Sequence, residues 1–142
     1  MPIIRAMSHP KRNWALVLGA SSGFGEAASI ALAKAGRNVF GVHLDRRATL
    51  PNVERITSEI EDAGGRASFF NVNAADAAKR AEVIAAMKET SAADPEAPAV
   101  DVVLHSLAFG TLKPFLGEEK ERMTQAQMDM TLDVMAHSLV YW

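Results

Sequence analysis

Glycines and serines gather in one short segment of this chain, and their types and spacing fit phosphate binding. The segment follows the apolar run Trp14–Leu18 and precedes an alanine-rich stretch that favours a helix. Where a strand turns sharply into a helix, glycines permit a close approach of the backbone, and the unpaired N–H groups of the first helical turn bind an anion. The alternative is a tight turn that binds nothing, but the strand before it and the helix after it favour binding. The candidate phosphate-binding residues are Gly19, Ser21, Ser22, Gly23, Phe24 and Gly25.

A second group of polar residues follows the next apolar run, Val39–Leu44. In dinucleotide-binding folds, a carboxylate at the end of the second strand binds the adenosine ribose, whereas arginine pairs with the 2′-phosphate of NADP(H). His43 occupies the place where the acidic residue is usual, and Asp45 lies two residues further on. Arg46 and Arg47 come next, so we expect them to bind the phosphate and favour NADP(H) over NAD(H). The alternative is that both arginines lie in a solvated loop.

Residues for acid–base or metal chemistry are few. Histidine is a common acid–base residue, but His105 is better explained as a strand-end histidine that is hydrogen-bonded in the core. It has no histidine or glutamate partner at metal-ligand spacing, and the chain has no cysteine, so we expect no metal site.

The elements that position these residues alternate regularly along the chain. The predicted strands are residues 14–18, 39–44, 67–72 and 100–104, and the predicted helices are residues 24–35, 49–63, 75–90 and 124–142. Such alternation gives a parallel sheet with helices on both faces, and right-handed crossovers give the strand order 3-2-1-4. We therefore predict an α/β fold, an incomplete doubly wound Rossmann-type domain over residues 14–142, preceded by a tail of residues 1–13.

The spacing Gly-x-x-x-Gly-x-Gly of residues 19–25 resembles the fingerprint of the short-chain dehydrogenase/reductase family. The likeness runs from Trp14 to the end of the chain. Two departures from the usual pattern are similar to the enoyl-acyl-carrier-protein reductases. His-Ser-Leu-Ala at residues 105–108 replaces the common Asn-Asn-Ala-Gly, and Met135 stands where ordinary members carry the asparagine of a proton relay. An equally good explanation of Met135 is that it belongs to an apolar core or subunit-contact stripe with Met128, Leu132 and Leu139.

The resemblance implies hydride transfer between a nicotinamide cofactor and a carbonyl or an activated carbon–carbon double bond. It places Asn71 and Val72 beside the adenine. It also places the backbone of Ser106, Leu107 and Ala108 beside the nicotinamide ribose. The complete enzyme would act on a small molecule or an acyl thioester, and it would be a homo-oligomer.

By this resemblance, the family's catalytic tyrosine and lysine lie beyond the last predicted helix. Tyr141 is the only tyrosine here, and no lysine follows it. We therefore assign no catalytic residue in this chain, and we expect the chain alone to be inactive. Three interpretations follow: a fragment of an oxidoreductase, one half of a split reductase, or a non-catalytic nucleotide-binding module. A methyltransferase is a weaker alternative, because its glycine turn is usually spaced differently.

Composition sets the remaining bounds. The net charge of −2 gives no sign of a nucleic-acid partner or an anionic membrane surface. No apolar run approaches the length that spans a bilayer. Residues 1–12 lack the apolar stretch of a secretory signal, so we expect a cytoplasmic protein.

Overall fold

Four parallel strands form the sheet, in the order β3-β2-β1-β4. The strands are β1 (Trp14–Leu18), β2 (Asn38–His43), β3 (Ala67–Asn71) and β4 (Val100–His105). The structure is a computed structural model, and it describes residues 12–97 and 99–142. Most of the predicted tail, residues 1–13, lies outside the described residues. The predicted strand order is confirmed, and each strand lies within one residue of its predicted bounds.

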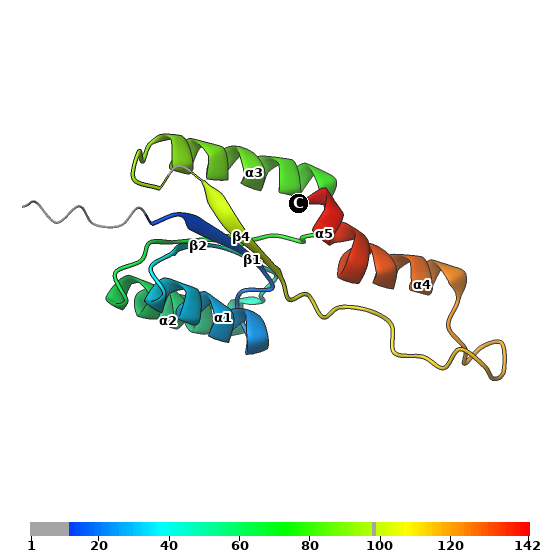
Figure 1. Cartoon of the computed structure of the whole chain (residues 1–142). Coiled ribbons are helices and arrows are strands. Elements are labelled where there is room, and N and C mark those ends of the chain that lie inside the picture. Colours follow the sequence, from blue (N-terminus) through cyan, green and yellow to red (C-terminus); the bar gives the residue numbers. More distant parts are fainter. Residues whose placement is uncertain (1–11, 98) are drawn as a thin grey trace, which may run out of the picture.

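Helices cover both faces of the sheet (Figure 1). The elements outside the sheet are α1 (Gly23–Lys34), the 3-10 turn η1 (Arg47–Thr49), α2 (Leu50–Asp62), α3 (Ala77–Ala92), α4 (Gln125–Leu132), the π-helical segment η2 (Asp133–His137) and α5 (Ser138–Tyr141). In Figure 1, α1 and α2 lie below the sheet and α3 lies above it. Among the described residues, no helix combines the length and the apolar character needed to cross a membrane.

Strand β1 is buried along its whole length because its two faces meet different helices. Side chains alternate between the faces of a strand. Leu16 therefore joins the core beneath α3, whereas Val17 joins the core formed with α1 and α2. Ile56 and Ile60, on the predicted apolar stripe of α2, are fully buried in that second core. Burial on both faces explains why β1 reads as a continuous apolar run.

The last helical stretch differs from the single helix that the sequence predicts. Its start is confirmed, because Thr124 and Gln127 form a capping box. The segment η2 then interrupts the α-helical geometry, and a π turn shifts the angular positions of the residues that follow it. Ser138 becomes fully buried, and Trp142 packs on the core beneath α3.

The predicted apolar stripe on this helix is therefore not core within the described chain. Leu132, Met135 and Leu139 are 43%, 44% and 48% exposed. The stripe was predicted by assuming α-helical spacing throughout. The segment η2 breaks that spacing for Met135 and Leu139, whereas Leu132 lies before it, at the end of α4. The core interpretation of these residues is wrong for this chain.

Candidate functional site

The carboxyl ends of the four strands bring all the candidate site segments to one edge of the sheet. Parallel strands share one direction, so the residues after each strand become neighbours. Three backbone hydrogen bonds of 2.8 Å join these segments: Gly19 N–H to the Val42 carbonyl, Val72 N–H to the His43 carbonyl, and Ser106 N–H to the Leu18 carbonyl. The glycine turn thus lies between the segment after β2 and the segment after β4.

Two glycines in the turn are required by close backbone contacts. A Cβ on Gly25 would lie 1.9 Å from the carbonyl oxygen of Gly19, so the start of α1 packs directly on the end of β1. A Cβ on Gly19 would lie 2.3 Å from the carbonyl oxygen of Ser106, so the loop after β4 packs directly on the glycine turn. Gly19 also has a φ of 86°, in the left-handed region that favours glycine.

The middle of the turn is open. Gly23 has a φ of 55°, and a Cβ there would meet no atom within 4 Å. Among the described residues, the N–H groups of Gly23, Phe24 and Gly25 have no hydrogen-bond acceptor. Ser22 is the N-cap of α1, and its side chain makes no capping bond. These donors point out of a helix N-terminus into free space, an arrangement that suits an anion. The Phe24 side chain is 90% exposed, so its contribution to such a site is its backbone N–H.

The segment after β2 is organised around Asp45. The imidazole Nδ1 of buried His43 lies 2.8 Å from a carboxylate oxygen of Asp45. The Asn71 side chain binds the backbone of Asp45 twice: its Oδ1 accepts from the Asp45 N–H at 2.9 Å, and its Nδ2 donates to the Asp45 carbonyl at 3.0 Å. Asn71 therefore fixes the loop after β2, in addition to its predicted place beside the adenine.

The carboxyl group of Asp45 is held in its charged form. Burial opposes ionisation, but hydrogen bonds with Ser21, Thr49 and His43 outweigh it, so the pKa of Asp45 lies below its ordinary value. Because Ser21 belongs to the glycine turn, these bonds also connect the turn with the loop after β2. A negative charge therefore stands beside the candidate phosphate site.

Arg46 and Arg47 lie on the solvent side of this loop. Both are exposed, and in the described part of the chain neither lies within ion-pair distance of a carboxylate. Arg47 begins the turn η1, which leads directly into α2. The two arginines thus follow Asp45 directly in the chain, with their side chains exposed.

The segment after β4 is anchored by His105. Its Nε2 lies 2.8 Å from the hydroxyl of Ser138, and that hydroxyl donates to the Val134 carbonyl at 2.6 Å. The hydroxyl therefore accepts the Nε2–H of the imidazole. This bond supports the interpretation of His105 as a hydrogen-bonded strand-end residue. Of the three predicted residues that follow, Ser106 and Leu107 are half-buried and Ala108 is exposed.

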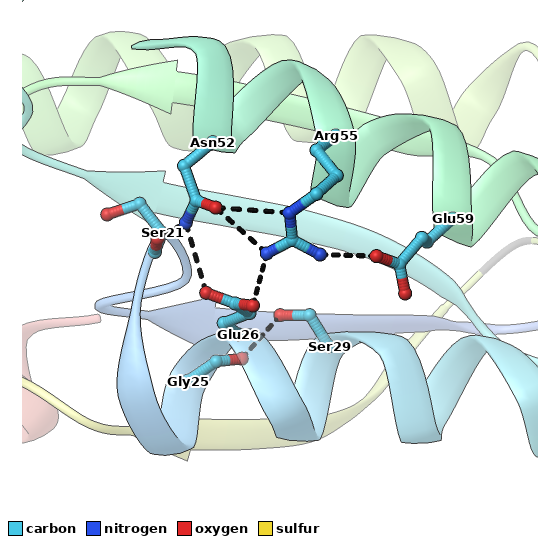
Figure 2. A network of polar contacts seen from close by, with 7 residues as sticks. All are labelled: Ser21, Gly25, Glu26, Ser29, Asn52, Arg55 and Glu59. Carbon is cyan, nitrogen blue, oxygen red and sulfur yellow. Dashed lines mark hydrogen bonds and ion pairs between the residues drawn. The ribbon is translucent and has the colours of Figure 1, made fainter. Parts of the chain in front are cut away.

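One part of the site is not predicted by the sequence. The Asn52 side chain of α2 donates to the Ser21 carbonyl at 2.7 Å and to the Glu26 carboxylate at 3.0 Å, and Arg55 contacts both Asn52 and Glu26 (Figure 2). The contacts from α2 to Ser21 and Glu26 join residues 26 to 31 apart in the chain, so no local spacing pattern indicates them. In the described residues, no cluster of three or more histidine, aspartate or glutamate side chains is arranged to hold a metal ion.

Comparison with known proteins identifies the fold and the motif together. A family model described as Enoyl-(Acyl carrier protein) reductase matches residues 19–142, which is most of the chain. The chain belongs to this branch of the short-chain dehydrogenase/reductase family. The match begins at Gly19, the first residue of the glycine turn, and it includes the β4 loop that departs from the common family pattern.

Solved structures of short-chain dehydrogenases/reductases share the fold. A short-chain dehydrogenase/reductase from Serratia marcescens superposes with a TM-score of 0.71 at 23% identity, over 94% of this chain and 49% of that one. The 3-oxoacyl-[acyl-carrier protein] reductase from Brucella melitensis in complex with NAD gives a TM-score of 0.71 at 19% identity, over 94% and 47%. YwfH, an NADPH-dependent reductase involved in bacilysin biosynthesis, gives 0.73 at 18%, over 91% and 46%. The chain thus spans about half the length of these reductases.

Replacing Gly25 with alanine is expected to destabilise the fold more than the same change at Gly23. The new Cβ of Gly25→Ala would overlap the Gly19 carbonyl, and neither backbone segment can move without distorting the sheet edge. We expect a loss of about 3 kcal/mol for Gly25→Ala and roughly 1 kcal/mol for Gly23→Ala, where only the positive φ is unfavourable. Urea unfolding followed by circular dichroism measures both, and an equal loss in the two variants would contradict the close-contact explanation.

The Asp45→Asn variant is expected to lose part of the acid sensitivity of the fold. Because the pKa of Asp45 is lower in the folded chain than in the unfolded chain, its ionisation stabilises the fold above the unfolded pKa. That contribution disappears as the pH falls from above the unfolded pKa of Asp45 through its lower folded pKa. The variant should therefore show a smaller fall in unfolding free energy across this window. Some fall will persist, because the pKa values of Glu26 and Asp101 are also lowered. An unchanged pH profile would show that Asp45 is not stabilised as a carboxylate.

Proposed function

We propose that this chain is the cofactor-binding half of an NAD(P)(H)-dependent oxidoreductase of the short-chain dehydrogenase/reductase type. The observation that carries the proposal is the open helix N-terminus at Gly23–Gly25, whose unpaired N–H groups face the space beside the Asp45 loop. A pyrophosphate would bind here through the free N–H groups of Gly23, Phe24 and Gly25. The β4 loop, packed on Gly19, lies where the nicotinamide end of such a ligand would extend.

The bound nicotinamide would supply the hydride chemistry, to a carbonyl or to an enoyl double bond. The chain's own share is to bind and orient the dinucleotide through Ser22, the N–H groups of the first turn of α1, and the Ser106–Ala108 backbone. The complete enzyme would be a homo-oligomer acting on a small molecule or an acyl thioester. A cytoplasmic location stays a prediction of the sequence.

We assign no catalytic residue, and we propose that the chain alone does not transfer hydride. Tyr141 lies on α5 and is 48% exposed, with the guanidinium of Arg80 5.1 Å from its ring centroid. No lysine follows it in the sequence. A split reductase completed by another chain, and a non-catalytic nucleotide-binding module, are the alternatives, and both use the same binding site.

For the cofactor, we propose NADP(H) rather than NAD(H). The proposal rests on the exposed arginines Arg46 and Arg47, which stand where a 2′-phosphate would be bound. One observation favours NAD(H): the charged carboxylate of Asp45 lies beside the turn, where it can accept the ribose hydroxyls and repel a phosphate. The cofactor preference therefore depends on whether the Asp45 carboxylate binds the ribose hydroxyls or Arg46 and Arg47 bind the 2′-phosphate.

The folded chain is expected to bind NADPH saturably, and Gly23→Val should weaken that binding by at least about tenfold. A valine at Gly23 fills the space that the pyrophosphate needs. Isothermal titration calorimetry measures both dissociation constants, with S-adenosylmethionine as a comparator ligand. Gly117→Val is the matched control, because Gly117 also has a positive φ and open space but lies in the loop before α4. No binding by a chain that circular dichroism shows to be folded would contradict the proposed function.

Removing the arginines is expected to change cofactor preference. The double variant Arg46→Ala/Arg47→Ala should bind NADPH about tenfold or more weakly and leave NADH affinity nearly unchanged, because charge-assisted bonds to the 2′-phosphate are lost. Lys120→Ala/Arg122→Ala, at two exposed basic residues in the loop before α4, controls for the loss of two positive charges. If the double variant keeps the same NADPH-to-NADH ratio while Asp45→Asn weakens NADH, the preference for NADP(H) is wrong and Asp45 is the ribose partner.

A further inference from the structure

The amide group of Asn52 bridges the two sides of the glycine turn. Its Nδ2 donates to the carbonyl of Ser21, which precedes α1, at 2.7 Å. The same nitrogen donates to the carboxylate of Glu26, which lies within the first turn of α1, at 3.0 Å (Figure 2). Asn52 belongs to a different helix, α2. One side chain of α2 therefore ties the segment before α1 to the helix itself.

Arg55 fixes the orientation of this amide. Its Nη2 donates to Asn52 Oδ1 at 2.8 Å and its Nε does so at 3.2 Å, while the guanidinium also pairs with Glu26 and Glu59. Because Oδ1 accepts from Arg55, the amide nitrogen must face the turn. The hydrogen bonds from Asn52 and from Arg55 both lower the pKa of Glu26, so the carboxylate that receives them stays charged.

The centre of the turn has few other restraints. Ser22, Gly23 and Phe24 are exposed, and the Ser22 side chain does not cap the helix. The ends of the turn are held by backbone contacts at Gly19 and Gly25. Among the described side chains, the backbone of residues 19–25 accepts a hydrogen bond from outside α1 only through Asn52. This bond therefore restrains the Ser21 carbonyl directly, in addition to the hydrogen bond between the Ser21 side chain and Asp45.

We propose that Asn52 is a positioning residue for dinucleotide binding, through its bond to the Ser21 carbonyl. By fixing that carbonyl, it sets the direction in which the N–H groups of Gly23 and Phe24 meet the anion. The role rests on the proposed function. The helix α2 begins directly after Arg46 and η1. The first turn of α2 therefore connects the glycine turn with the loop after β2, which would bind the ribose.

Two variants of Asn52 test the role. Asn52→Ala removes the bridge, and Asn52→Asp keeps the shape and the bonds from Arg55 but places an acceptor against the Ser21 carbonyl. Glu59→Gln is the control, because it removes a partner of Arg55 on the side away from the turn. Backbone order parameters from ¹⁵N relaxation report on residues 20–24, calorimetry reports on NADPH and NADH, and urea unfolding reports on the whole fold.

Both Asn52 variants should lower the order parameters of the turn from about 0.85 to below about 0.6. They should weaken NADPH and NADH by the same factor, about fivefold to tenfold, because both ligands share the pyrophosphate. Glu59→Gln should change neither quantity. A residue that only stabilised the fold would lower the unfolding midpoint while leaving the turn as ordered as in the parent.

Unchanged order parameters and unchanged affinities in a folded Asn52 variant would overturn the proposal. Asn52→Asp, which conserves the side-chain volume, serves if Asn52→Ala does not fold. Failure of the parent chain to bind either dinucleotide would contradict the proposed function. The order parameters would still show whether Asn52 orders the turn.

Discussion

The backbone contact between Gly25 and Gly19 is the constraint on which the rest of the site depends. With no side chain on either residue, the first turn of α1 can press against the end of β1, where a Cβ on Gly25 would come within 1.9 Å of the Gly19 carbonyl. This contact leaves the N–H groups at the start of α1 unpaired and directed into open space. The β4 loop packs on the other side of Gly19, so the same residue joins both halves of the binding edge.

The sheet brings the site segments together, and polar side chains hold them in position. Burial of β1 on both faces fixes the register of the parallel strands, which brings the four strand ends together. Around that edge, Asn71 holds the backbone of Asp45, His105 holds the last helical stretch through Ser138, and Asn52 holds the turn. Each of these side chains binds a segment distant in sequence, so the site is stabilised by contacts between elements. The glycines therefore determine the shape of the site, and these three side chains hold its segments in place.

The sequence predicts the frame well because its signals are local. Apolar runs, helix caps and the glycine spacing each lie within a few residues, and the strand order follows from handedness rules. The Asn52–Glu26–Arg55 network could not be predicted, because its members lie on two helices and carry no shared spacing. The segment η2 was also not predicted, since residues 133–137 have ordinary helix-compatible types and Ser138, directly after η2, binds the distant His105. Met135 lies within η2 and Leu139 follows it, and both are exposed.

The most direct test of the account is an NMR titration of the ¹⁵N-labelled chain with NADPH, because it reads all four strand ends in one experiment. The account predicts that amide signals move together in four groups: residues 19–25, 45–47, 71–72 and 106–108. We expect no chemical-shift changes at the opposite edge of the sheet, where Arg12, Arg66 and Asp94 line a separate pocket. Shifts confined to that opposite edge, or no shifts in a chain whose spectrum is that of a folded protein, would contradict a dinucleotide site at the carboxyl ends of the strands.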